Sequence, residues 1–369
     1  MNRPFLQNGK KFLRCLGKRP RRSPAVVQIE ITNRCNLHCA MCPRLKMDLP
    51  LRDMAYETFE AMISNLPEVE VMILTGWGEP LYHPDFFHFV ALTNRSLSKA
   101  EVRFTTNGLL LDAEHRAEIF HHRIGRINVS MEGLPKVLET ENRRSKTGNK
   151  PPASSPQPQP IGHAHPAVAM ENVAALIRER EDRTYPSIWL HSVIQRHGLE
   201  ELQSLIRWAG KVGVDGFNLF RLTVQHDPTL HRPDWEEEQR IIQEAKTLAK
   251  ASGLQWFCMN APTLILRAAG HFDRYCLRSD DYVYIDLEGY VTPCCNLRAY
   301  RCGNVLEQDL QTIWSNRRFE AFRTNPPEMC ERCDALTYRQ KVGAQRRCAP
   351  TGGQSPENLW TNFEDSHSS

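Results

Sequence analysis

The sequence predicts an α/β fold in which parallel strands alternate with helices, followed by a smaller cysteine-rich module. Short apolar runs rich in β-branched residues alternate with amphipathic stretches, and parallel strands require helical crossovers of this kind. Beyond about residue 253 this rhythm stops and cysteines become frequent. The first part is therefore either an open doubly wound sheet or a complete or partial barrel.

Up to six strand and helix units can be placed in the first part. The expected strands are 26–32, 69–75, 102–105, 126–130, 188–194 and 217–222. The expected helices are 56–66, 112–121, 167–181 and 200–212. In the second part, the runs 282–287 and 290–292 flank a Glu288-Gly289 turn and predict a β-hairpin, and a helix is expected at 310–323.

The composition excludes several classes of protein. Of the 369 residues, 41% are hydrophobic and 24% are charged, and no window approaches the roughly 18 consecutive apolar residues of a membrane span. Twelve cysteines are too sparse for a small disulfide scaffold, and no apolar signal-peptide core precedes a cleavage site. We therefore expect a cytoplasmic protein without a membrane span, in which clustered cysteines bind metal.

The net charge of +4 is unevenly distributed, because the N-terminal arm is strongly basic. Residues 1–24 hold eight Lys and Arg residues and no acid, which leaves the rest of the chain with a charge of −4. We favour a solvated or body-packed leader over contact with nucleic acid, an anionic membrane or an acidic partner. A mitochondrial transit peptide fits less well because the arm contains almost no Ser. The proline-rich insert 143–166 and the tail 349–369 are expected to be disordered.

Three cysteines follow the first expected strand. Cys35, Cys39 and Cys42 form a C-x3-C-x2-C pattern, and three thiolates in one loop can converge on an iron-sulfur cluster. Three ligands for four irons leave one iron open, which can bind a small molecule through an amine and a carboxylate. The alternatives are a zinc site completed by a residue such as His38, or three unrelated thiols.

A second group of cysteines lies in the C-terminal part. Cys294 ends the hairpin, and Cys330 and Cys333 form a C-x2-C pair that can chelate one metal centre. Together with one thiolate from a preceding loop, these make a closed four-thiolate site. A zinc ribbon is the alternative to an iron-sulfur cluster, because zinc ribbons also use C-x2-C pairs.

The three-cysteine pattern and the three motifs that follow it along the chain resemble those of the radical SAM superfamily. Residues 76–80, with the sequence GWGEP, resemble the family's GxGEP segment, whose backbone and carboxylate hold the amino group of S-adenosylmethionine. Its two glycines are interpreted as allowing close approach to the ligand. Residues 105–108 and 130–133 resemble the family's TNG and S-x-D-G positions, although Glu132 stands where Asp is usual.

Arg143 is similar in position to the family's arginine that pairs with the S-adenosylmethionine carboxylate. Met41 is placed to offer its backbone to the adenine, although simple packing explains it equally well. The resemblance thus implies S-adenosylmethionine contacts at Met41, Gly76, Gly78, Glu79, Pro80, Asn107, Ser130, Glu132 and Arg143.

The C-terminal part resembles the SPASM or Twitch extension of radical SAM enzymes. The resemblance places four auxiliary-cluster ligands at Cys276, Cys294, Cys330 and Cys333. Position 339 is Arg339 where the full two-cluster SPASM module needs another cysteine, so one auxiliary [4Fe-4S] cluster is implied. The substitutes, should one ligand be assigned wrongly, are Cys295, Cys302 and Cys348, of which Cys348 is more typical of a spare thiol.

The resemblance implies a partial (β/α)6 TIM-like barrel with a small α+β cluster-binding extension. The expected organisation is a basic arm at 1–24, a radical SAM core at 25–252, an auxiliary-cluster domain at 253–348 and a tail. The implied activity is reductive cleavage of S-adenosylmethionine at a [4Fe-4S] cluster to a 5′-deoxyadenosyl radical that abstracts a substrate hydrogen. We expect a dehydrogenase-like oxidation to follow through the auxiliary cluster, with a flavodoxin or ferredoxin as electron donor.

The substrate is expected to be a small molecule. The alternative is a peptide, as in maturases of ribosomally made peptides and of sulfatases. A third hypothesis is a non-catalytic iron-sulfur or zinc protein whose basic arm binds nucleic acid. The GxGEP-like segment speaks against it, because a purely structural cluster has no use for a segment that holds an amino acid. His191 and Asp215 could serve a substrate, but His191 alternates with apolar neighbours and is more typical of a core histidine.

Overall fold

The structure is a computed structural model, and it describes residues 21–132, 166–194, 199–227, 229–258, 272–333 and 335–340. Nearly all of the basic arm, the proline-rich insert except Pro166, and the tail lie outside the described residues, as do Arg143 and Cys348. Pro166 is the first residue of a helix, a position that suits proline because its fixed φ matches the helix and no hydrogen bond is lost.

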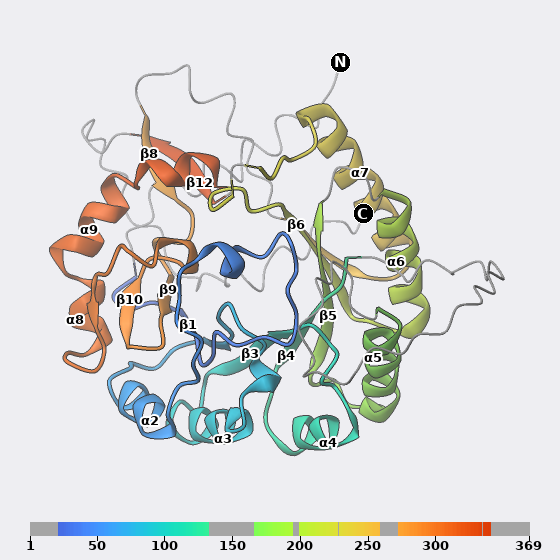
Figure 1. The fold of residues 1–369 in the computed structure, drawn as a ribbon, viewed down its shortest axis with the longest axis horizontal. Coiled ribbons are helices and arrows are strands. Elements are labelled where there is room, and N and C mark those ends of the chain that lie inside the picture. The colour runs from blue at the N-terminus through green and yellow to red at the C-terminus, as the bar shows by residue number, and fades with distance from the viewer. Residues whose placement is uncertain are drawn as a thin grey trace, which may run out of the picture.

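Ten strands form one continuous sheet in the order β11-β10-β9-β1-β2-β3-β4-β5-β6-β7. The strands β1 to β7 pair in parallel. Their bounds are β1 (Val26–Ile29), β2 (Val71–Leu74), β3 (Glu101–Thr106), β4 (Arg126–Ser130), β5 (Ser187–Ile194), β6 (Gly216–Arg221) and β7 (Gln255–Cys258). Figure 1 shows these strands curving round a centre with helices outside, which confirms the predicted partial barrel.

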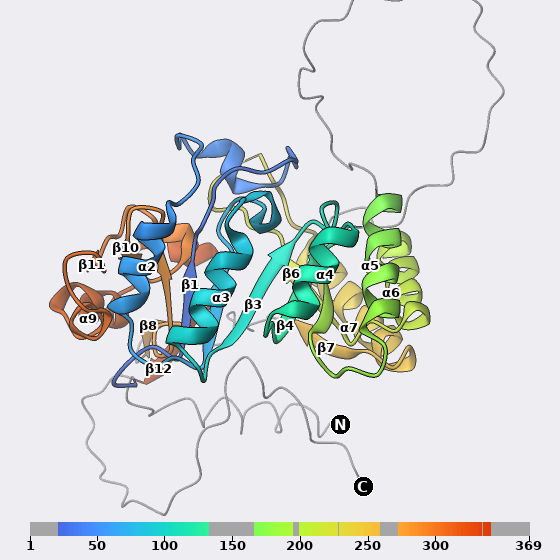
Figure 2. The ribbon, with the colours of Figure 1, turned by 90° about the horizontal axis from the view of Figure 1, so that it is seen from below.

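Six helices connect the parallel strands and cover the outer face of the sheet (Figures 1 and 2). They are α2 (Tyr56–Ser64), α3 (Phe86–Ser96), α4 (Ala113–His121), α5 (Pro166–Arg180), α6 (Leu199–Val212) and α7 (Trp235–Ala251). The helices α3 and α7 are not among those that the sequence pattern predicts. The aromatic start of α3 resembles a strand, whereas α7 carries a signal that was missed: Asp234 caps its first turn and three glutamates follow.

The C-terminal part begins with β8 (Phe272–Cys276), which pairs with β12 (Leu336–Gln340) in a separate two-stranded sheet. The predicted hairpin is confirmed as β9 (Tyr282–Ile285) and β10 (Tyr290–Thr292). Its turn depends on Gly289, whose φ of +83° disfavours other residues, and on Asp286, whose Oδ1 accepts from the backbone of Tyr290. A short strand, β11 (Gly303–Asn304), extends the hairpin on its other side.

The hairpin joins the barrel sheet directly, because β9 pairs in parallel with β1. At the other edge β7 pairs with β6, so the sheet also continues past the expected boundary at residue 252. The helix expected at 310–323 is two helices, α8 (Leu310–Trp314) and α9 (Arg317–Thr324). The break occurs at Asn316, whose side chain caps α9 by accepting from the Phe319 backbone.

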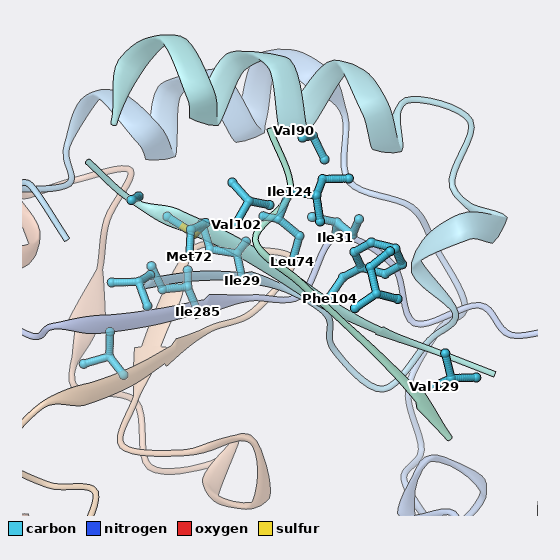
Figure 3. Close-up of a cluster of buried hydrophobic side chains, with 14 of the residues drawn as sticks. Ile29, Ile31, Met72, Leu74, Val90, Val102, Phe104, Ile124, Val129 and Ile285 are labelled. Carbon is cyan, nitrogen blue, oxygen red and sulfur yellow. The ribbon is translucent and has the colours of Figure 1, made fainter. Parts of the chain in front are cut away.

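Alternate residues of the strands pack outward against the helices. Ile29, Leu74 and Phe104 are fully buried in this layer, which Figure 3 shows beneath the helices. The residues between them therefore face the opposite side, which we call the inner face. In the described part of the chain, no helix combines the length and the apolar character that a membrane crossing requires.

Candidate functional site: two cysteine clusters

The first three cysteines lie in the loop between β1 and a short 3-10 helix, η1 (Pro43–Lys46). The loop is fixed by its own backbone: Cys42 N donates to Cys39 O at 2.9 Å, and Leu37 N donates to the Cys35 sulfur at 3.3 Å. Burial raises the pKa of the Cys35 thiol to about 11 and also raises the pKa of Cys39, and the charge of Cys42 raises both further. The loop therefore gathers three thiols that need a cation to become thiolates together.

Arg44 lies under this loop and was missed by the sequence analysis. Its side chain is 7% exposed and donates to Leu37 O at 2.8 Å, and its charge lowers the pKa of both Cys35 and Cys39. It thus holds the loop and partly compensates the charge of the thiolates.

The GWGEP segment packs against the cysteine loop. Gly78 N donates to Thr32 O at 3.2 Å, and a Cβ on Gly78 would lie 2.4 Å from Arg34 O. A Cβ on Gly76 would lie 2.2 Å from the Glu30 side chain. These close approaches are to protein atoms, and the approach of the two glycines to a ligand stays a prediction. The segment is held at a fixed position relative to the cysteines.

Glu79 is buried, at 3% exposure, and its carboxylate joins two of the predicted motifs. It accepts from Thr106 Oγ1 and from the Asn107 backbone, both at 2.7 Å. Burial raises its pKa to about 7 in spite of these hydrogen bonds. Pro80 follows as the first residue of a 3-10 turn, η2 (Pro80–Tyr82).

The remaining predicted ligand contacts surround the same loop. Asn107 donates to Asn36 Oδ1 at 2.7 Å and lies 4.0 Å from the Cys35 sulfur. Ser130 is exposed at the end of β4. Glu132 accepts from Val193 N at 2.9 Å, and its charge raises the pKa of Cys39.

Met41 is half-buried in the cysteine loop. The structure therefore brings the described members of the predicted S-adenosylmethionine site together at the carboxyl ends of β1 to β4.

The four predicted auxiliary ligands also lie together. Cys276 ends β8, Cys294 follows β10, and Cys330 and Cys333 flank the end of a 3-10 helix, η4 (Glu328–Arg332). Burial and the charges of Cys333 and Cys330 raise the pKa of Cys276 to about 12. Burial raises the pKa of Cys294 as well, and the charges of Cys276 and Cys333 add to the shift.

The substitute ligands differ from one another. Cys295 is adjacent to Cys294 and within electrostatic reach of Cys333. Cys302 is 5% exposed, its sulfur faces Tyr300 O at 3.7 Å, and its pKa responds to Arg318 and Arg323 rather than to another thiol. Cys302 is thus separate from the four.

Cys294 and its neighbour Cys295 lie on the inner face of the barrel. Cys294 and Cys295 pack against an apolar group formed by Ala25, Val26, Val71, Tyr282 and Tyr284. A pocket of about 430 Å³ is lined by Met47, which follows η1, and by His226 and Asn296. It therefore lies between the first cysteine loop and the loop that follows Cys295.

Two family models match this chain in the regions just described. Residues 29–150 match the radical SAM superfamily, and residues 276–334 match SPASM, an iron-sulfur cluster-binding domain. The chain belongs to the radical SAM superfamily and carries a SPASM domain. The cofactors of such a protein are S-adenosylmethionine, its [4Fe-4S] cluster and auxiliary iron-sulfur ligation in the SPASM domain.

The radical SAM chain is similar to two curated proteins over most of its length. It is 26% identical to the tungsten-containing aldehyde ferredoxin oxidoreductase cofactor-modifying protein of Pyrococcus furiosus, over 80% of this chain and 82% of that protein. It is 24% identical to the AdoMet-dependent heme synthase of Methanosarcina barkeri, over 86% of this chain and 90% of that protein.

Solved structures share the fold at low identity. SuiB of Streptococcus suis bound to S-adenosylmethionine superposes with a TM-score of 0.63 at 14% identity, over 86% of this chain and 71% of that one. The protein anSMEcpe with bound AdoMet superposes with a TM-score of 0.58 at 15% identity, over 84% and 83%. These likenesses show the barrel fold with its C-terminal extension.

The residues present fit these cofactors. Each group of buried thiols has raised pKa values, and iron provides the positive charge that stabilises them as thiolates. Among the described residues, no three His, Cys, Asp or Glu side chains are arranged to hold a single metal ion. A cube of four irons takes one thiolate per iron, so its ligands stand further apart than those of one zinc ion. The match of residues 276–334 to an iron-sulfur cluster-binding domain favours a cluster over zinc at the second site.

Proposed function

We propose that this radical SAM enzyme oxidises a small-molecule substrate on the inner face of its barrel. When bound, the first cluster and S-adenosylmethionine supply a 5′-deoxyadenosyl radical that takes a substrate hydrogen, and the auxiliary cluster supplies an acceptor for the electron that the substrate then loses together with a proton. The first cluster is assigned to Cys35, Cys39 and Cys42. The auxiliary cluster is assigned to Cys276, Cys294, Cys330 and Cys333.

The observation that carries the proposal is the place of the auxiliary cysteines. Cys294 packs on the inner face over β1 and β9, next to Tyr284. In the same loop, Arg298 pairs with Glu30, whose other oxygen accepts from the backbone of Trp77 in the GWGEP segment. An electron acceptor held there lies beside the face on which hydrogen abstraction takes place, rather than at a remote surface.

A small molecule is favoured over a peptide by the relatives that span most of the chain. Their names describe a cofactor-modifying protein and a heme synthase. A peptide substrate is the second candidate, because SuiB has been solved with its precursor peptide SuiA and shares this fold with a TM-score of 0.62. We also propose a flavodoxin or ferredoxin as the donor of the first electron.

The test uses the full chain, reconstituted under argon with iron and sulfide. We expect dithionite-reduced wild type to form 5′-deoxyadenosine from S-adenosylmethionine. A Cys330→Ala/Cys333→Ala protein should lose iron and one cluster signal in electron paramagnetic resonance, keep 5′-deoxyadenosine formation and lose the oxidised product. Cys302→Ala is the matched control and should keep both clusters.

Two outcomes would contradict the proposal. Absence of 5′-deoxyadenosine despite a reducible cluster would remove the enzymatic function and restore the non-catalytic alternative. An unchanged yield of oxidised product in the Cys330→Ala/Cys333→Ala protein would remove the auxiliary cluster from the oxidation while leaving the first step intact.

A further inference from the structure

The inner face of the barrel changes character away from the auxiliary cysteines. On β4, β5 and β6 it carries Asn128, His191 and Asn218, whereas the intervening Val129 and Leu190 pack outward in the main core. The strand register pairs His191 with Asn218 and Asn128 with Trp189. Polar side chains from three adjacent strands therefore form one continuous surface inside the barrel.

Two polar atoms on this surface have no partner within the described residues. They are Asn128 Oδ1 and Trp189 Nε1, on side chains that are 9% and 4% exposed. Leaving a buried donor or acceptor unpaired is unfavourable, because the group loses its hydrogen bonds to water and gains none in return. An unpaired acceptor and an unpaired donor on neighbouring strands of an enzyme's inner face indicate a ligand that supplies both.

The charge of this surface narrows the ligand class. The inner-face positions of β4, β5 and β6 include no Asp or Glu. The Arg126 guanidinium lies over the Trp189 ring, 4.3 Å from its centroid. Burial and the charge of Arg126 lower the pKa of His191 to about 3, so its ring is neutral and offers one donor and one acceptor. The surface suits a neutral amide-like edge, and these strand positions provide no carboxylate to balance the charge of an ammonium group.

Aromatic rings border the same polar groups. The rings of His191 and Phe220 lie 5.0 Å apart, and Phe257 extends this wall at 6.2 Å from Phe220. A planar heterocycle can stack on such a ring through its π face, and this contact does not require a charged ligand.

The geometry points to a binding site for a planar heteroaromatic substrate, whose amide or ring-nitrogen edge is recognised by Asn128, His191 and Asn218 and whose ring lies against Phe220. This inference rests on the proposed function. Ser130, an expected S-adenosylmethionine contact, is the register partner of His191, so the site lies beside the point where hydrogen abstraction takes place. A non-planar sugar or cyclitol cannot stack a π face on this aromatic wall.

The test is anaerobic titration calorimetry of the reconstituted full chain in the presence of S-adenosylmethionine. The probes are guanosine, 6-hydroxymethylpterin, lumichrome and deuteroporphyrin, with myo-inositol as the non-planar control. We expect at least one planar probe to bind and myo-inositol not to bind. Asn128→Leu and Asn218→Leu should each weaken that binding at least tenfold, whereas Asn94→Leu on the outer helix α3 should leave it unchanged.

His191 provides a second readout that does not depend on folding of the leucine variants. His191→Gln keeps a donor and an acceptor and should retain binding within about threefold, whereas His191→Phe should lose it. Equal binding by these two variants, or binding that is unchanged in Asn128→Leu, would overturn the assignment. If no planar probe binds while 5′-deoxyadenosine still forms, the heteroaromatic class is wrong and a peptide becomes the leading substrate. If 5′-deoxyadenosine is absent as well, the proposed function fails with it.

Discussion

Glu30 and Arg298 form a buried ion pair that joins the end of β1 to the loop after Cys295. The pair is 2.5 Å long, and the Glu30 side chain is fully buried. The other Glu30 oxygen accepts from Trp77 N at 3.0 Å, and Gly76 packs against the same side chain. One carboxylate thus fixes the glycine-rich turn of the first site and the cysteine loop of the second site relative to each other.

Replacing Arg298 alone should lower the free energy of unfolding more than replacing Arg298 and Glu30 together. Arg298→Met leaves a buried carboxylate without its charge partner, which costs about 3–5 kcal/mol. Glu30→Met/Arg298→Met also removes the Glu30 carboxylate and leaves only Asp286, which lies 3.9 Å from Arg298 in the wild type, without this charge partner, so part of this loss should be recovered. Urea unfolding under argon measures the free energy of unfolding of the single and the double variant.

The matched control is Arg240→Met, because Arg240 forms an exposed pair with Glu244 at 3.4 Å. We expect this change to alter stability by less than about 1 kcal/mol. An Arg298→Met protein as stable as the control would contradict the role given to the ion pair.

A methyl group on Gly78 should disable the first site alone. Its Cβ would lie 2.4–2.9 Å from backbone atoms of Thr32 and Arg34, so the cysteine loop must move. We expect Gly78→Ala to lose most 5′-deoxyadenosine formation and to keep the auxiliary cluster signal. Gly253→Ala is the control: φ there is +75° but the space is open, so it should cost about 1 kcal/mol of stability and leave turnover unchanged. Normal turnover by Gly78→Ala would show that the loop tolerates the shift.

The sequence predicted the barrel strands and the three-cysteine loop well because these have local signals. An apolar run followed by Gly, Asn or Cys marks the carboxyl end of a strand wherever it lies in the chain. The pairing of β9 with β1 has no such signal, since Val26 and Tyr282 are distant in sequence. The break between α8 and α9 was visible in principle, because Asn316 is a good helix cap.

The buried charges around the clusters were not predicted. Glu30, Arg44 and Arg298 look like ordinary surface residues in the sequence, and only the folded chain shows that each is enclosed and paired. The glycines of the GWGEP segment illustrate the same limit. Their conformational role could be inferred, but the packing of Gly78 against Thr32 and Arg34, and of Gly76 against Glu30, is visible only in the folded chain.

Arg278 should raise the reduction potential of the auxiliary cluster. It lies over the Tyr282 ring at 5.4 Å, and its charge lowers the pKa of Cys276, Cys294 and Cys295. A nearby cation stabilises the more negative, reduced cluster. We therefore expect Arg278→Gln to shift the auxiliary potential downward and Arg278→Lys to shift it less, in a redox titration followed by electron paramagnetic resonance.

The control for this shift is Arg301→Gln. Arg301 is exposed and lies over the Tyr290 ring at 3.7 Å, so solvent screens its charge and the potential should stay unchanged. A higher reduction potential in Arg278→Gln would contradict the stabilisation of the reduced cluster by the Arg278 charge.

Glu79 should make the stability of the protein fall as pH rises toward neutrality. Its folded pKa of about 7 lies above the ordinary value of 4.5, because burial disfavours the carboxylate. The folded state therefore keeps a proton that the unfolded chain releases, so this contribution is complete below pH 4.5 and is lost as pH rises through about 7. The full change is about 3 kcal/mol, by the usual conversion of a pKa difference. Glu79→Gln should remove this part of the pH dependence.

Urea unfolding of the reconstituted protein under argon, from about pH 5.5 to about pH 7.5, measures the slope that the linkage relation predicts. Glu60→Gln on the exposed side of α2 is the matched control and should keep the wild-type slope. A Glu79→Gln protein with the same slope as wild type would show that the carboxylate is already ionised in the folded state. In that case the hydrogen bonds from Thr106 and Asn107, at 2.7 Å, outweigh the cost of its burial.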